Sequence, residues 1–180
     1  TAINTLAQQK RLAFASKTPG RTQHINLFAL GPADAPDALF ADLPGYGYAA
    51  VERDAKLRWQ QVMADYLAQR RDLSGVVLLA DSRLGLTELD HRLLEWIGQR
   101  VRTGAVKLLV LLTKADKLSR KEADASLNAT TAALGAYSSD EADIGITLFS
   151  ALKKTGLEDV ALTLRGWVAP PLMLSCRTWR

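Results

Sequence analysis

The stretch Val106–Asp116 reads VKLLVLLTKAD, an apolar run that ends in a short polar segment. An uninterrupted apolar run of this length is typical of a strand that is buried on both faces of a parallel sheet. A second stretch, Gly75–Asp81, reads GVVLLAD and shows the same pattern with an acidic residue at its end. The two stretches therefore predict two buried strands, over Val106–Thr113 and Gly75–Asp81.

Weaker patterns on either side predict further strands and helices. Strands are predicted at residues 24–30, 38–42 and 144–150. Helices are predicted, mainly from an apolar period of 3.6 residues, over residues 1–9, 53–71, 87–100, 119–134 and 157–168. Ser119 and Glu122 have the spacing of a capping box at a helix start. Strands that alternate with helices predict an α/β domain with a mainly parallel sheet.

The composition excludes several classes of protein. Hydrophobic residues make up 48% of the 180 residues and charged residues 23%, which excludes a mainly disordered chain. The apolar runs are far shorter than the ~20 residues of a membrane helix, and no signal peptide is recognisable. Cys176, His24 and His91 are the only cysteine and histidines, too few for a disulfide or a Cys/His zinc site. These features predict a cytoplasmic protein.

The formal net charge of +4 is confined to the start of the chain. Residues 1–33 hold four basic residues and no acidic one, whereas the remainder holds equal numbers of both. This segment is either a solvated basic loop or a surface that meets phosphate from a nucleotide or a nucleic acid.

Ligands of such sheets bind beyond the carboxyl ends of the strands, and four loops there carry polar residues. The first is Asp42-Leu43-Pro44-Gly45. A carboxylate at a strand tip can hold magnesium through water, and a glycine three residues later lets a backbone N–H approach a phosphate. The same spacing is common in ordinary turns, so this loop alone leaves both interpretations open.

The second loop is Thr113-Lys114-Ala115-Asp116. Guanine presents two adjacent donors, N1–H and the 2-amino group, and the Asp116 carboxylate can accept from both, whereas adenine cannot supply that pair. The stem of Lys114 would lie along the base and ribose. The alternative is a charged loop that starts a helix. Four adjacent residues that suit guanine at the end of a strand favour guanine recognition.

The remaining two loops give weaker signals. Ser150-Ala151 has small side chains that would let backbone N–H groups reach a base oxygen. The basic segment Thr18–Gln23 contains threonine, whose hydroxyl can ligate magnesium beside a γ-phosphate in a loop ordered by nucleotide. Each could equally be an ordinary surface loop.

Three stretches together resemble the EngB family of bacterial GTPases, also called YihA or YsxC. They read KTPGRTQ at residues 17–23, DLPGYGYA at residues 42–49 and SALKKTG at residues 150–156. The resemblance runs from Thr1 to about Trp167. It implies a three-layer Ras-like P-loop GTPase fold, with helices on both faces of a mainly parallel sheet. It also implies a GTPase domain over residues 1–169, followed by an irregular tail over residues 170–180.

The resemblance further implies which residues bind GTP or GDP with Mg²⁺. Nucleotide contacts are implied for Gly20, Arg21, Thr22, Gln23 and His24, with Thr22 as the magnesium ligand. The γ-phosphate would face Asp42, Leu43, Pro44 and Gly45. Guanine would be read by Thr113, Lys114, Ala115 and Asp116, and the base would be covered by Phe149, Ser150 and Ala151. Many GTPases place a water-orienting glutamine after the glycine of the second motif, but Tyr46 stands there, so no catalytic residue is assigned.

One element of a GTPase is absent from this sequence. The P-loop, Gly-x-x-x-x-Gly-Lys-[Ser/Thr], cradles the β-phosphate, and none of the 12 glycines is followed by lysine. Thr1–Leu6 resembles the helix that follows the family's P-loop, and the strand before it, central in the family's sheet, is missing too. A sheet without that strand leaves two ladders of unpaired backbone groups. We therefore expect a truncated form of a longer protein, inactive and weak in GTP binding by itself.

The function implied by the resemblance is slow, partner-stimulated GTP hydrolysis in the assembly of the large ribosomal subunit. The same resemblance implies a need for the protein in normal cell division and septation. Partners would be the large subunit or its precursor, through rRNA or ribosomal proteins, and we expect a monomer with no membrane partner. Two alternatives stay open: a non-hydrolysing RNA-binding or assembly factor on a degenerate GTPase fold, and a flavodoxin-like or Rossmann-type enzyme. Against the latter, no Gly-x-Gly-x-x-Gly follows a predicted strand.

Overall fold

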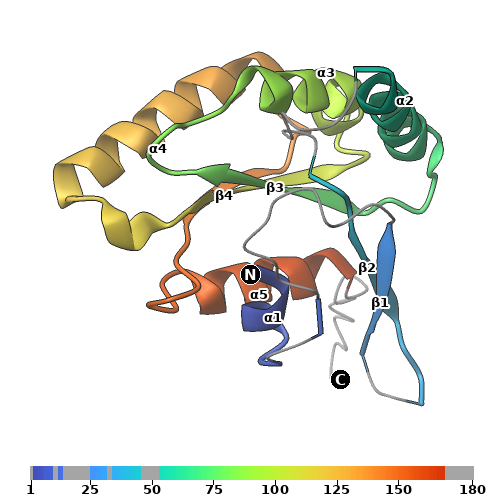
Figure 1. Ribbon diagram of the computed structural model, residues 1–180, viewed down its shortest axis with the longest axis horizontal. Coiled ribbons are helices and arrows are strands. Elements are labelled where there is room, and N and C mark those ends of the chain that lie inside the picture. Colours follow the sequence, from blue (N-terminus) through green and yellow to red (C-terminus); the bar gives the residue numbers. More distant parts are fainter. Residues whose placement is uncertain (1, 10–11, 14–24, 32–33, 46–52, 169–180) are drawn as a thin grey trace, which may run out of the picture.

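The computed structural model describes residues 2–9, 12–13, 25–31, 34–45 and 53–168 (Figure 1). Its strands are β1 (Asn26–Leu30), β2 (Ala38–Asp42), β3 (Gly75–Asp81), β4 (Lys107–Thr113) and β5 (Ile144–Leu148). Its α-helices are α1 (Ala2–Leu6), α2 (Arg53–Gln69), α3 (Glu88–Arg102), α4 (Arg120–Leu134) and α5 (Leu157–Val168). Two short 3-10 helices, η1 (Ala115–Lys117) and η2 (Gly135–Tyr137), are additions that no apolar period indicated.

Strands β3, β4 and β5 form a parallel sheet with β4 in the middle. The register pairs Asp81 of β3 with Thr113 of β4, so these two strands end level with each other. Strands β1 and β2 form a separate antiparallel hairpin in which Asn26 lies opposite Asp42. The predicted α/β fold with a mainly parallel sheet is therefore confirmed.

Helices cover both faces of the parallel sheet, and the alternation of side chains along β4 explains why (Figure 1). The even-numbered residues of Leu108–Leu112 pack in one apolar core with residues of α2, α3 and α4. The odd-numbered Leu109 and Leu111 pack on the other face with Val160 of α5 and Leu6 of α1. A strand between two cores needs an apolar residue at every position, which is what the uninterrupted run supplies.

The helix starts are set by local side chains. The predicted capping box of α4 is present, since Ser119 N–H donates to the Glu122 carboxylate at 2.7 Å and the Ser119 hydroxyl accepts from Glu122 N–H at 3.4 Å. Thr87, the first residue of the helix predicted over residues 87–100, forms an equivalent box with Asp90 at the start of α3. Each box satisfies backbone donors that a helix start would otherwise leave unpaired.

An apolar groove is lined by residues of both β2 and β3 and has a volume of about 1100 Å³. Within the described ranges, neither of these strands has a second strand partner. Leu39 of β2 and Leu79 of β3 line the groove and are 57% and 49% exposed. This is the arrangement expected of a sheet that lacks its central strand within the described residues.

The predicted tail over residues 170–180 lies outside the described residues, and the boundary at residue 169 stays a prediction. In the part of the chain that the structure describes, no helix combines the length and the apolar character needed to cross a membrane.

Candidate functional site

The loops after β3, β4 and β5 lie at one edge of the parallel sheet because parallel strands end on the same side. Backbone hydrogen bonds join these loops. Ser82 N–H donates to the Thr113 carbonyl at 2.9 Å, and Ala115 N–H donates to the Phe149 carbonyl at 3.2 Å. The Thr113–Asp116 loop is therefore held on both sides by the loops of its neighbouring strands.

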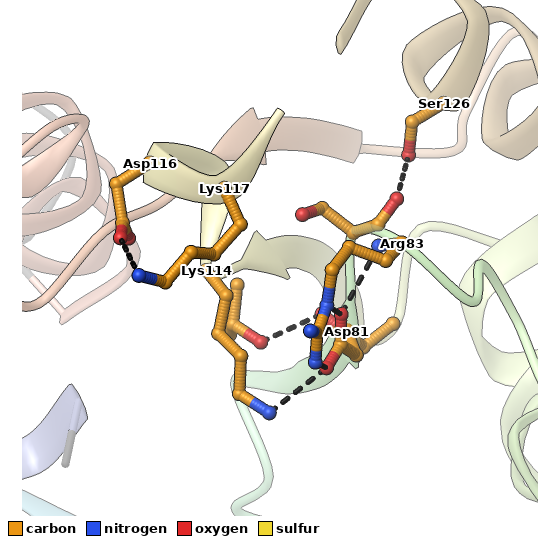
Figure 2. A network of polar contacts seen from close by, with 9 residues as sticks. Asp81, Arg83, Lys114, Asp116, Lys117 and Ser126 are labelled. Carbon is orange, nitrogen blue, oxygen red and sulfur yellow. Dashed lines mark hydrogen bonds and ion pairs between the residues drawn. The ribbon is translucent and has the colours of Figure 1, made fainter. Parts of the chain in front are cut away.

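Asp116, the residue predicted to read guanine, lies against the loop after β5. The buried Ser150 hydroxyl donates to Asp116 Oδ1 at 2.6 Å, and this hydrogen bond lowers the pKa of Asp116. Ser150 Oγ in turn accepts from Lys153 N–H at 3.1 Å. Lys117 Nζ forms an ion pair with Asp116 Oδ2 at 3.7 Å (Figure 2). Because each carboxylate oxygen has two lone pairs, both oxygens of Asp116 can still accept from a ligand.

Lys114 has a left-handed backbone, with φ 59° and ψ 30°, which residues other than glycine seldom adopt. Its ammonium donates to Asp81 Oδ2 at 2.8 Å, and Arg83 Nη2 donates to the same oxygen at 2.7 Å (Figure 2). Arg83 foremost, and also Lys114, holds the pKa of Asp81 well below its usual range. Neither Asp81 nor Arg83 was predicted to belong to this site. The signal was available, because β3 ends in an acidic residue just as β2 does.

Phe149 was predicted to cover the base together with Ser150 and Ala151. Its side chain is only 1% exposed and packs in the core with Leu109 and Val160. Phe149 contacts the neighbouring loop through its backbone, because its carbonyl accepts from Ala115 N–H. Ala151 is exposed at the same edge of the sheet.

Asp42 ends β2 and is partly buried, and this burial raises the pKa of its carboxyl. Among the described residues, no hydrogen bond or ion pair reaches the carboxylate. Leu43 packs against the core, Pro44 is buried and Gly45 is exposed. A partly buried carboxylate of this kind is suited to a cation. No cluster of three or more potential metal-ligating side chains occurs in the described ranges.

Five predicted site residues, Gly20, Arg21, Thr22, Gln23 and His24, lie outside the described residues. The nucleotide contacts of this segment and the role of Thr22 as a magnesium ligand stay predictions.

Gly156 closes the loop that carries Ser150. Its φ is +70°, and a Cβ there would contact the Leu148 carbonyl oxygen. Gly85 is a matched control, because its φ is +69° but a Cβ there would meet nothing within 4 Å. Gly85→Ala should therefore lower the free energy of unfolding only by the cost of a left-handed backbone at alanine, about 1–2 kcal/mol. Gly156→Ala should lose clearly more, since the backbone must also shift. Denaturant unfolding of both variants measures the difference, and equal losses would contradict the contact.

Relatives of this chain are found among bacterial proteins. It is 58% identical over 170 residues to the probable GTP-binding protein EngB of Acidovorax ebreus (strain TPSY), covering 94% of this chain and 74% of that protein. It is 56% identical over 171 residues to the probable GTP-binding protein EngB of Polaromonas sp. (strain JS666), covering 95% of this chain and 66% of that protein. This chain thus spans about two thirds to three quarters of the length of these two relatives.

Two solved structures have a similar fold. Era in complex with MgGDPNP and nucleotides 1506–1542 of 16S ribosomal RNA matches with a TM-score of 0.67 and 18% identity, over 94% of this chain and 52% of Era. The bacterial selenocysteine-specific elongation factor EF-Sec matches with a TM-score of 0.62 and 19% identity, over 92% of this chain and 26% of EF-Sec. At this level of identity the similarity shows the fold alone, and it confirms the expected GTPase-type architecture.

A family model described as a 50S ribosome-binding GTPase matches residues 1–114, which include β1 to β4 and the first half of the Thr113–Asp116 loop. The close relatives extend the match over more than nine tenths of the chain. On these grounds the chain belongs to the EngB family of GTP-binding proteins, within the ribosome-binding GTPases.

Proposed function

We propose that the protein binds GTP and GDP with Mg²⁺, hydrolyses GTP slowly, and acts in assembly of the large ribosomal subunit. The observation that carries the proposal is the Asp116–Ser150 pair. The buried Ser150 hydroxyl donates to Oδ1 of Asp116 and fixes the carboxylate at the carboxyl edge of β4, and because each carboxylate oxygen has two lone pairs, both can still accept from a ligand. A fixed carboxylate suits a base that presents two adjacent donors, and guanine presents them.

The phosphate end of the site would lie at the Asp42–Gly45 loop. Asp42 would hold Mg²⁺ through water, and Thr22 would be a further ligand. When bound, Mg²⁺ supplies positive charge that neutralises the phosphate oxygens. The carboxylate fits this role by its position at the end of β2, and a nearby cation would offset the effect of burial, which raises its pKa. Gly45 is exposed and would let a backbone N–H approach the γ-phosphate.

Slow hydrolysis is inferred from the sequence after Gly45. Tyr46, which lies outside the described residues, cannot orient a water in the way a glutamine does. A ribosomal partner would then supply the water-orienting group that the free protein lacks, or bring such a group into place. The matched family model and the basic character of residues 1–33 support a partner that contains RNA.

From the family resemblance we further propose that residues 1–169 form a GTPase domain and that the protein is a cytoplasmic monomer. We also propose that it is needed for normal cell division and septation.

Single-turnover hydrolysis tests the proposed activity, with protein expressed from its complete coding sequence. Phosphate release should be slow for the free protein and faster with large-subunit particles, whereas small-subunit particles should have no effect. Fast release by the free protein would contradict the partner-dependent mechanism. Particle binding that is equal with GTP, GDP and no nucleotide would instead favour the alternative, a non-hydrolysing assembly factor.

A further inference from the structure

Asp81 lies outside the residues expected to bind the nucleotide, yet its carboxylate contacts Lys114 of the guanine-reading loop. We propose that Asp81 is a positioning residue, which holds the Lys114 side chain in one orientation across the base site. This inference rests on the proposed function, because it concerns the same guanine site.

Asp81 is itself held rigidly. It pairs in register with Thr113, and its carbonyl accepts from Leu84 N–H at 2.9 Å and Gly85 N–H at 3.0 Å. Its Oδ1 accepts from Arg83 N–H at 3.0 Å and from Arg83 Nε at 2.9 Å. The side chain is only 15% exposed. The carboxylate is therefore a fixed point at the end of β3.

The Lys114 side chain, in contrast to the Asp81 carboxylate, is flexible, and the rest of the structure fixes only the Lys114 backbone. Lys117 N–H donates to the Lys114 carbonyl at 2.9 Å, which helps to hold the left-handed conformation. The side chain is 58% exposed and has a flexible four-carbon stem. The ion pair with Asp81 is the contact that selects one direction for this stem. Figure 2 shows Lys114 extending toward Asp81, while Lys117 extends toward Asp116.

The effect of the ion pair should fall on binding rather than on folding. An ion pair whose lysine is exposed to solvent, as Lys114 is, contributes little to stability. A flexible side chain that must be ordered when a ligand binds lowers affinity, and one that is ordered beforehand does not. Asp81 would therefore orient Lys114 before the base arrives.

A double-mutant cycle tests the proposal, with Asp81→Asn and Lys114→Met made singly and together in protein expressed from its complete coding sequence. The dissociation constant for GDP is measured by equilibrium titration. Asp81→Asn should weaken GDP binding by about two- to tenfold. In the Lys114→Met background the same substitution should change affinity by less than about twofold, because the group it positions is gone.

Asp72 provides a matched control at the other end of β3. It pairs with Arg70 at 3.0 Å, two residues away, as Asp81 pairs with Arg83. Asp72→Asn should leave GDP affinity unchanged. If Asp81→Asn does not fold, Asp81→Glu keeps the charge and should give a smaller loss that again disappears with Lys114→Met.

The outcomes separate this inference from the proposed function. Equal effects of Asp81→Asn with and without Lys114, or no loss of affinity, would overturn the positioning role while the wild type still binds GDP. A wild type that binds no guanine nucleotide would overturn both.

Discussion

Asp116→Asn is expected to weaken GTP binding by about tenfold to several hundredfold and to strengthen binding of xanthosine triphosphate. The carboxylate would accept from two guanine donors, whereas an amide offers one acceptor and one donor. The amide N–H would meet the guanine 2-amino group donor to donor. Xanthine carries a carbonyl at that position, so the donor is matched again.

The geometry around Asp116 decides which way the amide of the variant would point. The Ser150 hydroxyl donates to Oδ1, and Ser150 Oγ is already an acceptor for Lys153 N–H. The carbonyl oxygen of the introduced amide should therefore keep the Oδ1 position, which places the amide nitrogen where Oδ2 stood. The oxygen at the Oδ1 position can still accept from N1–H of either base, whereas the nitrogen at the Oδ2 position clashes with the guanine 2-amino group and matches the xanthine carbonyl, which predicts an exchange of preference rather than a general loss.

Titration with both nucleotides measures the effect, in protein expressed from its complete coding sequence. Asp124→Asn, an exposed substitution on α4, serves as a control that should change neither affinity. If Asp116 only caps the loop, both nucleotides should weaken equally or not at all. Unchanged GTP affinity would exclude base recognition by Asp116.

Phe149→Ala is expected to lower the free energy of unfolding by about 3–5 kcal/mol. The side chain is 1% exposed and lies in the core beside Leu111 and Val160, so truncation leaves a cavity between β4 and α5. Chemical denaturation followed by circular dichroism measures the loss. A loss below about 1 kcal/mol would contradict a core position.

Phe149→Leu separates packing from base recognition. It keeps an apolar side chain and the backbone carbonyl that accepts from Ala115 N–H. GDP affinity should then change far less than stability does. A large loss of affinity with little loss of stability would instead mean that the aromatic ring covers the base.

The strands and most helix starts could be predicted because their signals are local. Gly75–Asp81 is a strand with the predicted bounds, and Ser119 with Glu122 caps α4 as expected. The Thr113–Asp116 loop was recognised as a candidate for guanine recognition in the same way, since four adjacent residues follow a recognisable strand. Asp81 could be recognised as the acidic end of its strand, but its local sequence did not predict which side chain it would contact.

Contacts between distant residues could not be predicted from patterns. Lys114 meets Asp81 only because β3 and β4 pair in a register that no local spacing specifies. Arg100 of α3 donates to the carbonyls of Leu67 and Arg70 at the end of α2, a contact across about thirty residues. Phe149 precedes Ser150 in the family's motif, and only the packing of α5 shows that its ring belongs to the core.

The division of the strands into a hairpin and a parallel sheet has a consequence for how the molecule opens. All strand pairing of β4 lies within the unit from β3 to α5, whereas β1 and β2 pair only with each other in the described ranges. Leu27 and Leu39 of the hairpin are 53% and 57% exposed, so little apolar burial resists its local unfolding. The hairpin and the parallel sheet should then behave as separate cooperative units. Backbone amides of β4 would exchange with solvent only when the larger unit opens, and those of β1 and β2 would exchange through smaller and more frequent fluctuations.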